Sequence, residues 1–123
     1  MPHLDNFDNQ QMTLPAGGDL AAYARVKLNT AGAVVAAGPT DPAIGTVDER
    51  GAVNGQYCGV RLLGLPHNFI AAGAIEVGDI CWAAASGKVN DVDAGSARVA
   101  GIALTAAGAD GDELTLLMCD YVS

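Results

Sequence analysis

The second half of this chain repeats the plan of its first half, and this repeat constrains the fold more than any other feature. Residues 24–62 align with residues 79–118. In both segments a short apolar run leads into a turn of small residues that ends in glycine, Gly32 in the first half and Gly87 in the second. These two glycines are 55 positions apart. The pattern predicts that the repeated unit is a small meander of β-strands.

A second pair of glycines supports the same alignment. Gly45 and Gly101 each stand inside a β-type run, and the alternating run that ends each half places Val60 against Leu116. A glycine inside a strand marks a bend or the close approach of a neighbouring backbone. We therefore predict that Gly45 and Gly101 hold equivalent places and that the two halves superpose.

The length and composition predict one all-β domain. The chain has 123 residues, of which half are apolar and sixteen are glycine, a composition that suits short strands and tight turns. Turn signals recur at roughly the 8 to 12-residue spacing of an all-β sandwich or barrel. We predict a small β-sandwich or barrel-like domain of two pseudo-repeated meanders. Its strands are expected at residues 22–29, 33–37, 43–48, 57–65, 68–71, 79–84, 87–91, 98–104 and 113–121.

Residues 1–19 differ from the rest. They are rich in Asn, Asp and Gln, contain two prolines and end near a pair of glycines. This composition favours neither a helix nor a regular strand, so we predict an extended N-terminal arm. A β domain follows over residues 20–123, with pseudo-repeats at about 22–64 and 76–121. The same composition fits a frayed end without a role and an arm that becomes ordered on a partner surface.

The alternation within the expected strands predicts a set of core side chains. These are Val26, Leu28, Ile44, Val60, Leu62, Ile80, Trp82, Val99, Ile102, Leu114 and Leu116. The three cysteines, Cys58, Cys81 and Cys119, are odd in number and lie inside apolar runs. This pattern favours buried, reduced thiols over a disulfide framework or a zinc site.

The charge excludes several classes of partner. The formal net charge is −8, with only six lysines and arginines, whereas nucleic-acid binding needs clustered basic side chains. An acidic surface also disfavours anionic membranes, and no run approaches the roughly 20 apolar residues of a membrane span. The N-terminus is polar and acidic, so we predict no signal peptide and synthesis in a host cytoplasm.

The sequence lacks a converging set of catalytic groups. His3 lies in the arm, and His67 follows Pro66 between the repeats, where a solvated side chain is the expected role. An enzyme remains an alternative only through a thiol–imidazole pair of Cys58 and His67. We predict no catalytic residue and no cofactor.

Two acidic segments are candidates for metal sites. Residues 91–95 resemble the start of a calcium loop, but Ile102 stands where such a loop requires a bidentate glutamate. Residues 110–113 are rich in Asp and Gly, as solvated turns are. We predict no metal site.

The second half resembles a known family. Residues 78–89 open with Gly-Asp, continue through a Trp-containing run and end in Gly-Lys-Val. A glycine-containing strand at 98–104, an acidic turn and a final strand at 110–116 follow, and residues 42–47 repeat the pattern in the first half. This arrangement over residues 20–119 is similar to that of bacteriophage capsid decoration proteins, also called cement or head-stabilising proteins.

The resemblance implies a non-enzymatic protein on the outer capsid surface of a virion. Such proteins are expected to form homotrimers that bridge subunits of the major capsid protein. The arm is expected to contact the capsid through Pro2, His3, Leu4, Phe7, Met12 and Leu14. The alternative is a small β adhesion or carbohydrate-binding module on a virion or tail, against which the scarcity of aromatic residues counts.

Overall fold

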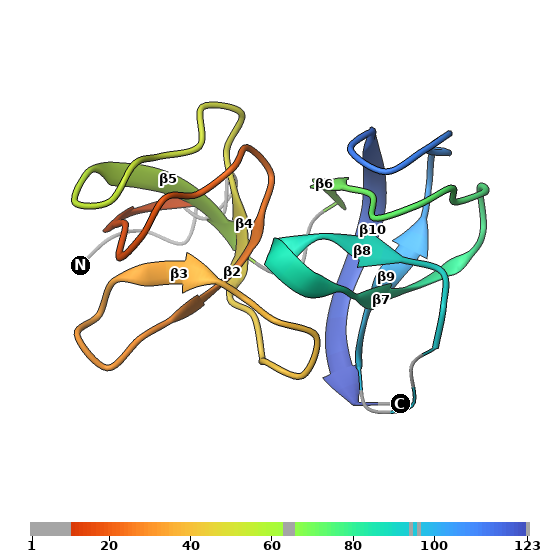
Figure 1. The fold of residues 1–123 in the computed structure, drawn as a ribbon, viewed down its shortest axis with the longest axis horizontal. Helices are drawn as coiled ribbons and strands as arrows, with labels where there is room; N and C mark the ends of the chain where they lie inside the picture. The colour runs from red at the N-terminus through yellow and green to blue at the C-terminus, as the bar shows by residue number, and fades with distance from the viewer. Residues whose placement is uncertain (1–10, 63–65, 94, 96, 123) are drawn as a thin grey trace, which may run out of the picture.

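The computed structural model describes residues 11–62, 66–93, 95 and 97–122, which form two five-stranded sheets lying side by side (Figure 1). The first sheet contains β1 (Gln11–Pro15), β2 (Arg25–Leu28), β3 (Val34–Ala36), β4 (Gly45–Val47) and β5 (Tyr57–Leu62). The second contains β6 (Pro66–Ile70), β7 (Ile80–Ala83), β8 (Val89–Asn90), β9 (Arg98–Ala103) and β10 (Glu113–Val122). A short 3-10 turn, η2 (Ala85–Gly87), joins β7 to β8. We call residues 11–62 unit one and residues 66–122 unit two.

The two units have the same topology, and the fold is all-β as predicted. The strand order is β1-β5-β4-β2-β3 in the first sheet and β6-β10-β9-β7-β8 in the second, and every paired strand is antiparallel. Adding five to each strand number of the first order gives the second order. The internal repeat read from the sequence is therefore a repeat of structure.

The connections between strands repeat as well. A parallel bridge between Ala16 and Val34 recurs between Ala71 and Val89, 55 positions later. The turn glycines Gly32 and Gly87, which the repeat aligned, have φ angles of 82° and 74°. Both therefore adopt a left-handed conformation that glycine accepts without the steric cost of a side chain.

Gly45 and Gly101 hold equivalent places, as the repeat predicted. Gly45 pairs with Val26 and Leu62, and Gly101 pairs with Cys81 and with the backbone of β10 at the corresponding register. A Cβ atom built on Gly45 would lie 1.9 Å from the carbonyl oxygen of Arg61. The close approach of β5 therefore requires a glycine in β4.

Each unit has its own hydrophobic core. That of unit one consists of Ala16, Leu20, Ala24, Val26, Val34, Val47, Cys58 and Val60. That of unit two consists of Phe69, Ala71, Ile75, Cys81, Val89, Ala100, Ala103, Ala107, Leu114 and Leu116, together with Ala43 from unit one. Ala43 therefore contributes to the packing between the two units.

The predicted core is right in part. Val26, Val60, Val99, Leu114 and Leu116 are buried. Ile44, Leu62 and Trp82 are partly buried.

Three predicted core residues, Leu28, Ile80 and Ile102, are exposed, and for these the prediction was wrong. Ile80 and Ile102 alternate with buried Cys81 and Ala103, so they point to the opposite face of the sheet. Leu28 lies at the end of β2.

The predicted arm of residues 1–19 is wrong for its second part. Residues 1–10 lie outside the described residues, but Gln11–Pro15 form β1 and pair along their whole length with β5. Ala16 and Leu20 are buried in the core of unit one. An edge strand needs only one neighbour and tolerates polar side chains on its exposed face, which is why its composition did not predict it.

Candidate functional site

His67, the histidine considered as a base, has a structural role. Its Nε2–H donates to the carbonyl oxygen of Leu62 at 2.6 Å, so Nδ1 accepts the hydroxyl proton of Thr46 at 2.8 Å. Burial lowers the pKa of His67 to about 4, so the ring is neutral at pH 7. Since β6 places His67 at the contact with β4, this histidine joins the two units rather than serving as a solvated loop residue.

The cysteines of the described cores are free and buried. Burial raises the pKa of Cys58, and it raises the pKa of Cys81 to about 12. A thiol with such a pKa remains protonated near neutral pH and is a poor nucleophile. The Cys58 thiol donates to the carbonyl oxygen of Leu14 at 3.5 Å. Both nitrogens of His67 are occupied by Thr46 and Leu62, so the two groups do not form a thiol–imidazole pair.

The acidic segments stabilise turns. Asp112 accepts the N–H groups of Gly108 and Ala109, and Asp110 forms an ion pair with Lys88 at 2.9 Å. Across the described ranges, His, Cys, Asp and Glu side chains form no cluster that could hold a metal ion. The described part of the chain also contains no helix long and apolar enough to span a membrane.

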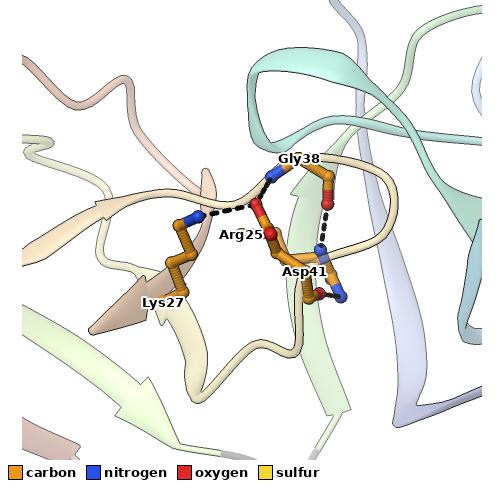
Figure 2. A network of polar contacts seen from close by, with 4 residues as sticks. All are labelled: Arg25, Lys27, Gly38 and Asp41. Carbon is orange, nitrogen blue, oxygen red and sulfur yellow. Dashed lines mark hydrogen bonds and ion pairs between the residues drawn. The ribbon is translucent and has the colours of Figure 1, made fainter. Parts of the chain in front are cut away.

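A buried arginine holds the loop between β3 and β4 (Figure 2). The Arg25 guanidinium donates to the carbonyl oxygens of Gly38 at 3.0 Å and Asp41 at 2.6 Å. The Asp41 carboxylate accepts from Lys27 at 2.8 Å and from the N–H of Gly38 at 2.8 Å. The Lys27 hydrogen bond and then that of Gly38 lower the pKa of Asp41.

This loop also contacts unit two. The N–H of Arg98, at the start of β9, donates to the carbonyl oxygen of Pro39 at 2.9 Å. Ala43, at the end of the loop, lies in the core of unit two. The Arg25 network therefore places a loop of unit one where it contributes to the other unit's core.

The outer face of the first sheet, which points away from its core, carries a polar row. Arg25 lies opposite Thr46, Thr46 lies opposite Arg61, and Arg61 lies opposite Gln11, on four adjacent strands. We call these four residues the polar row. Unit two covers its inner part together with the loop between β3 and β4. The strand β6 contacts β4, η2 contacts β2, and Arg25 donates to Gly38 and Asp41 of that loop. Figure 1 shows the teal turn between β7 and β8 beside β2.

The corresponding row of the second sheet is apolar. Ile80 lies opposite Ile102, Ile102 opposite Leu117, and Leu117 opposite Pro66. Cross-strand partners have Cβ atoms about 5 Å apart, so these four residues form one strip across β7, β9, β10 and β6. All four are exposed. We call them the apolar row.

Sequence reasoning missed the apolar row because it placed Ile80 and Ile102 in the core. A signal was available in the repeat itself. The aligned halves set Arg25, Thr46 and Arg61 of the polar row against Ile80, Ile102 and Leu117 of the apolar row. Positions that are polar in one repeat and apolar in the other indicate a face whose surroundings differ between the repeats.

The predicted capsid-contact residues fall into two groups. Pro2, His3, Leu4 and Phe7 lie outside the described residues. Met12 and Leu14 belong to β1, where Met12 is half exposed and Leu14 packs against the core of unit one. Leu14 therefore belongs to the folded unit.

A shallow depression of about 530 Å³ lies on unit one beside β1 and β5. Its lining includes Gln11, Asp48, Gln56 and Tyr57, and the Tyr57 side chain is exposed. Amides, a carboxylate and an aromatic ring are groups that bind sugars. The carbohydrate-binding alternative stays a prediction, and this depression is the surface on which it can be tested.

Comparison with known proteins identifies the family. A family model described as phage cement protein matches residues 6–119. Among solved structures, the head fiber gp8.5 N base of bacteriophage phi29 is similar, with a TM-score of 0.71 and 21% identity over 92% of this chain and 97% of that chain. At this identity the likeness shows a common fold. No curated protein matches the chain. Because the family model spans most of its length, the chain belongs to the phage cement proteins, a family of structural, capsid-associated proteins and not of enzymes.

Proposed function

We propose that this cement protein binds the outer surface of an icosahedral phage head and stabilises it by bridging neighbouring subunits of the major capsid protein. It acts as a homotrimer. The observation that carries this proposal is the family match over residues 6–119, on a chain built as two fastened β units. A clamp of this kind needs a rigid body with more than one contact surface, and it needs no catalytic group.

The joint between the units supports the required rigidity. Thr46 bonds to His67 across it, Pro39 accepts from Arg98, and Ala43 enters the second core. A body that is already ordered loses little conformational entropy when it docks. Many copies on one shell gain further from multivalency, so each contact need not be strong.

The segment before β1 supplies the proposed capsid grip. Pro2, His3, Leu4 and Phe7 lie within residues 2–10, directly ahead of the edge strand β1. A segment that becomes ordered on binding can cross a boundary between subunits, at an entropic cost. Leu14 is left out of this grip because it packs against the core, and Met12 belongs to the folded unit.

The test uses phage heads that lack their decoration protein. The chain is added to such heads, the heads are sedimented, and bound copies per particle are counted. We expect saturable binding and a higher temperature of DNA release from decorated heads. Binding without a change in that temperature would contradict stabilisation by bridging, and absence of binding would contradict decoration of that head.

A truncated chain tests the grip separately. Deleting residues 2–10 leaves both described units intact, so the truncated chain is expected to fold normally and to occupy fewer capsid sites. Equal occupancy by the full and truncated chains would remove the N-terminal segment from the contact. The matched control is a full-length variant in which residues 2–10 are scrambled at the same composition. It separates the effect of the sequence of this segment from the effect of its length.

A further inference from the structure

The contact between the two units is made by surfaces that both units possess in equivalent form. Unit one contributes the polar row on the outer face of β2 and β4. Unit two contributes the end of its sheet where β6 and η2 lie. Because the strand order and register repeat, unit two has its own version of the first surface, and unit one has its own version of the second. Between the described residues of a single chain, one such contact is made.

The outer-face positions differ in exposure, most directly at Thr46, because the loop between β3 and β4 also helps to cover Arg25. Arg25 and Thr46 are 0% and 2% exposed, whereas their equivalents Ile80 and Ile102 are 48% and 43% exposed. Leu117 and Pro66 extend the strip across two further strands. A row of four adjacent exposed apolar residues is more than scattered surface hydrophobics, and such patches mark contact sites.

The sheet-end positions show the reverse difference. His67 is 1% exposed, whereas its equivalent Met12 is 49% exposed. Ala83 is buried at the end of β7, whereas its equivalent Leu28 at the end of β2 is exposed. Unit one therefore presents an uncovered end at which the two equivalent side chains are apolar.

The chemistry of the two uncovered surfaces matches. Inside the chain, Thr46 and His67 meet as a polar pair with a 2.8 Å hydrogen bond. Their equivalents are Ile102 and Met12, an apolar pair. Both members change together from polar to apolar, as expected if Ile102 and Met12 face one another when two copies meet.

We propose that the apolar row of one copy is covered by the Met12–Leu28 end of unit one of a second copy, in a head-to-tail contact that imitates the joint inside the chain. This contact names the surfaces through which the homotrimer of the proposed function would form, and it rests on that proposed function. A head-to-tail contact joins different surfaces of the two copies, so it closes into a ring when the rotation permits. Three copies in a ring would align six repeats.

The first experiment measures the solution mass of the full chain over a range of concentrations by sedimentation equilibrium. The wild-type chain is expected to associate beyond the single-chain mass of 12.4 kDa. A variant with Ile102→Thr and Leu117→Arg carries the residues that the polar row has at these positions. It is expected to associate at least about tenfold more weakly, as the loss of central contact residues does.

Two further variants locate the other side of the contact. Met12→Lys changes unit one only, yet it is expected to weaken association to a similar degree. Val53→Arg changes an exposed apolar residue that belongs to neither surface, and its association is expected to match that of the wild type. Circular dichroism and melting temperature at low concentration check that all variants fold.

The direction of the contact is tested by mixing two cysteine variants, Met12→Cys and Ile102→Cys. A disulfide between copies is expected in the mixture and not in either variant alone. A disulfide between two copies of the same variant, in the absence of the other variant, would overturn the head-to-tail arrangement. A wild-type chain that stays at 12.4 kDa at every concentration would overturn the contact itself.

Head binding separates this proposal from the proposed function. A variant with Ile102→Thr and Leu117→Arg that is monomeric but still binds heads would support the contact and leave decoration intact. A wild-type monomer whose head binding is lost with the same changes would overturn the contact and assign the apolar row to the capsid protein. Absence of head binding by a wild-type oligomer would contradict decoration of that head and support the contact.

Discussion

Gly45 shows how closely one residue can be tied to the sheet around it. A methyl group there would lie 1.9 Å from the carbonyl oxygen of Arg61 and 2.7 Å from its carbonyl carbon. Gly45→Ala is therefore expected to lower the free energy of unfolding by about 1–3 kcal/mol, because β4 and β5 must move apart. Gly101→Val is expected to act in the same direction at the equivalent place.

Chemical denaturation of these variants provides the measurement. Gly73→Ala is the matched control, because a Cβ atom at Gly73 meets nothing within 4 Å. It is expected to leave stability within about 0.5 kcal/mol of the wild type. An unchanged midpoint for Gly45→Ala would show that the strands adjust without cost.

His67 makes the stability of the chain depend on pH. Burial lowers its pKa in the folded state to about 4, against an ordinary value of 6.5. Between these values the unfolded chain binds more protons than the folded chain, so stability rises with pH in that window. The free energy of unfolding is therefore expected to fall as pH decreases from 6.5 towards 4.

Urea titrations across this window test the assignment. His67→Gln is expected to flatten the dependence, since glutamine does not take up the proton. His3→Gln leaves the buried imidazole in place and is expected to behave as the wild type does. A wild-type stability that is constant between pH 6.5 and 4.5 would contradict the buried, neutral imidazole.

The loop between β3 and β4 is held in place by hydrogen bonds of Arg25 and Asp41. Asp41→Ala removes both the ion pair with Lys27 and the acceptor for the Gly38 N–H. It is expected to destabilise the chain by at most about 1 kcal/mol, since water screens the partly exposed ion pair. Because the pKa of Asp41 is lowered, this contribution is present above the ordinary value of 3.8 and is lost as pH falls through the folded-state value.

Thermal unfolding of Asp41→Ala at neutral and acidic pH is the measurement. Asp41→Asn keeps an acceptor for Gly38 and should lose less stability. Asp110→Ala removes the more exposed ion pair with Lys88 and is expected to have little effect. Equal losses for Asp41→Ala and Asp110→Ala would show that the loop network contributes nothing special.

At the scale of elements, β1 decides what can be removed from the N-terminus. Deleting residues 2–18 removes β1 together with its pairing to β5 and the buried Ala16. This deletion is expected to lower the melting temperature and to expose Cys58 to alkylation. Deleting only residues 2–10 is expected to leave Cys58 protected. Equal protection in both deletions would show that β1 is dispensable for the fold.

The internal repeat makes most strands predictable from the sequence. The strand β1 and the apolar row are the features that it did not predict. Turn glycines and alternating runs predict the segments that contain β2–β5 and β7–β10, but not their exact ends, since β2 begins at Arg25 and not at residue 22. The strand β1 is the counterpart of β6, for which the sequence predicts a strand at residues 68–71, but the polar composition of residues 1–19 predicts an arm in its place. The apolar row was misplaced because alternation gives two faces, and only packing decides which face is buried.

At the scale of the whole molecule, two equivalent units make one contact and leave one of each surface uncovered. The uncovered surfaces are the apolar row of unit two and the Met12–Leu28 end of unit one. Exposed apolar surfaces of this kind are typical of proteins that form assemblies. The membership in the phage cement proteins identifies the larger assembly as a phage capsid. We propose that the apolar row serves in contact between copies and that the segment before β1 serves in contact with the capsid.

The most direct test is a cryo-EM reconstruction of undecorated phage heads before and after incubation with the full chain. The account predicts additional density on the outer surface, in groups of three copies that lie across boundaries between capsid subunits. Both five-stranded sheets of each copy should fit this density. Heads that gain no density, or copies that each contact a single capsid subunit, would contradict it.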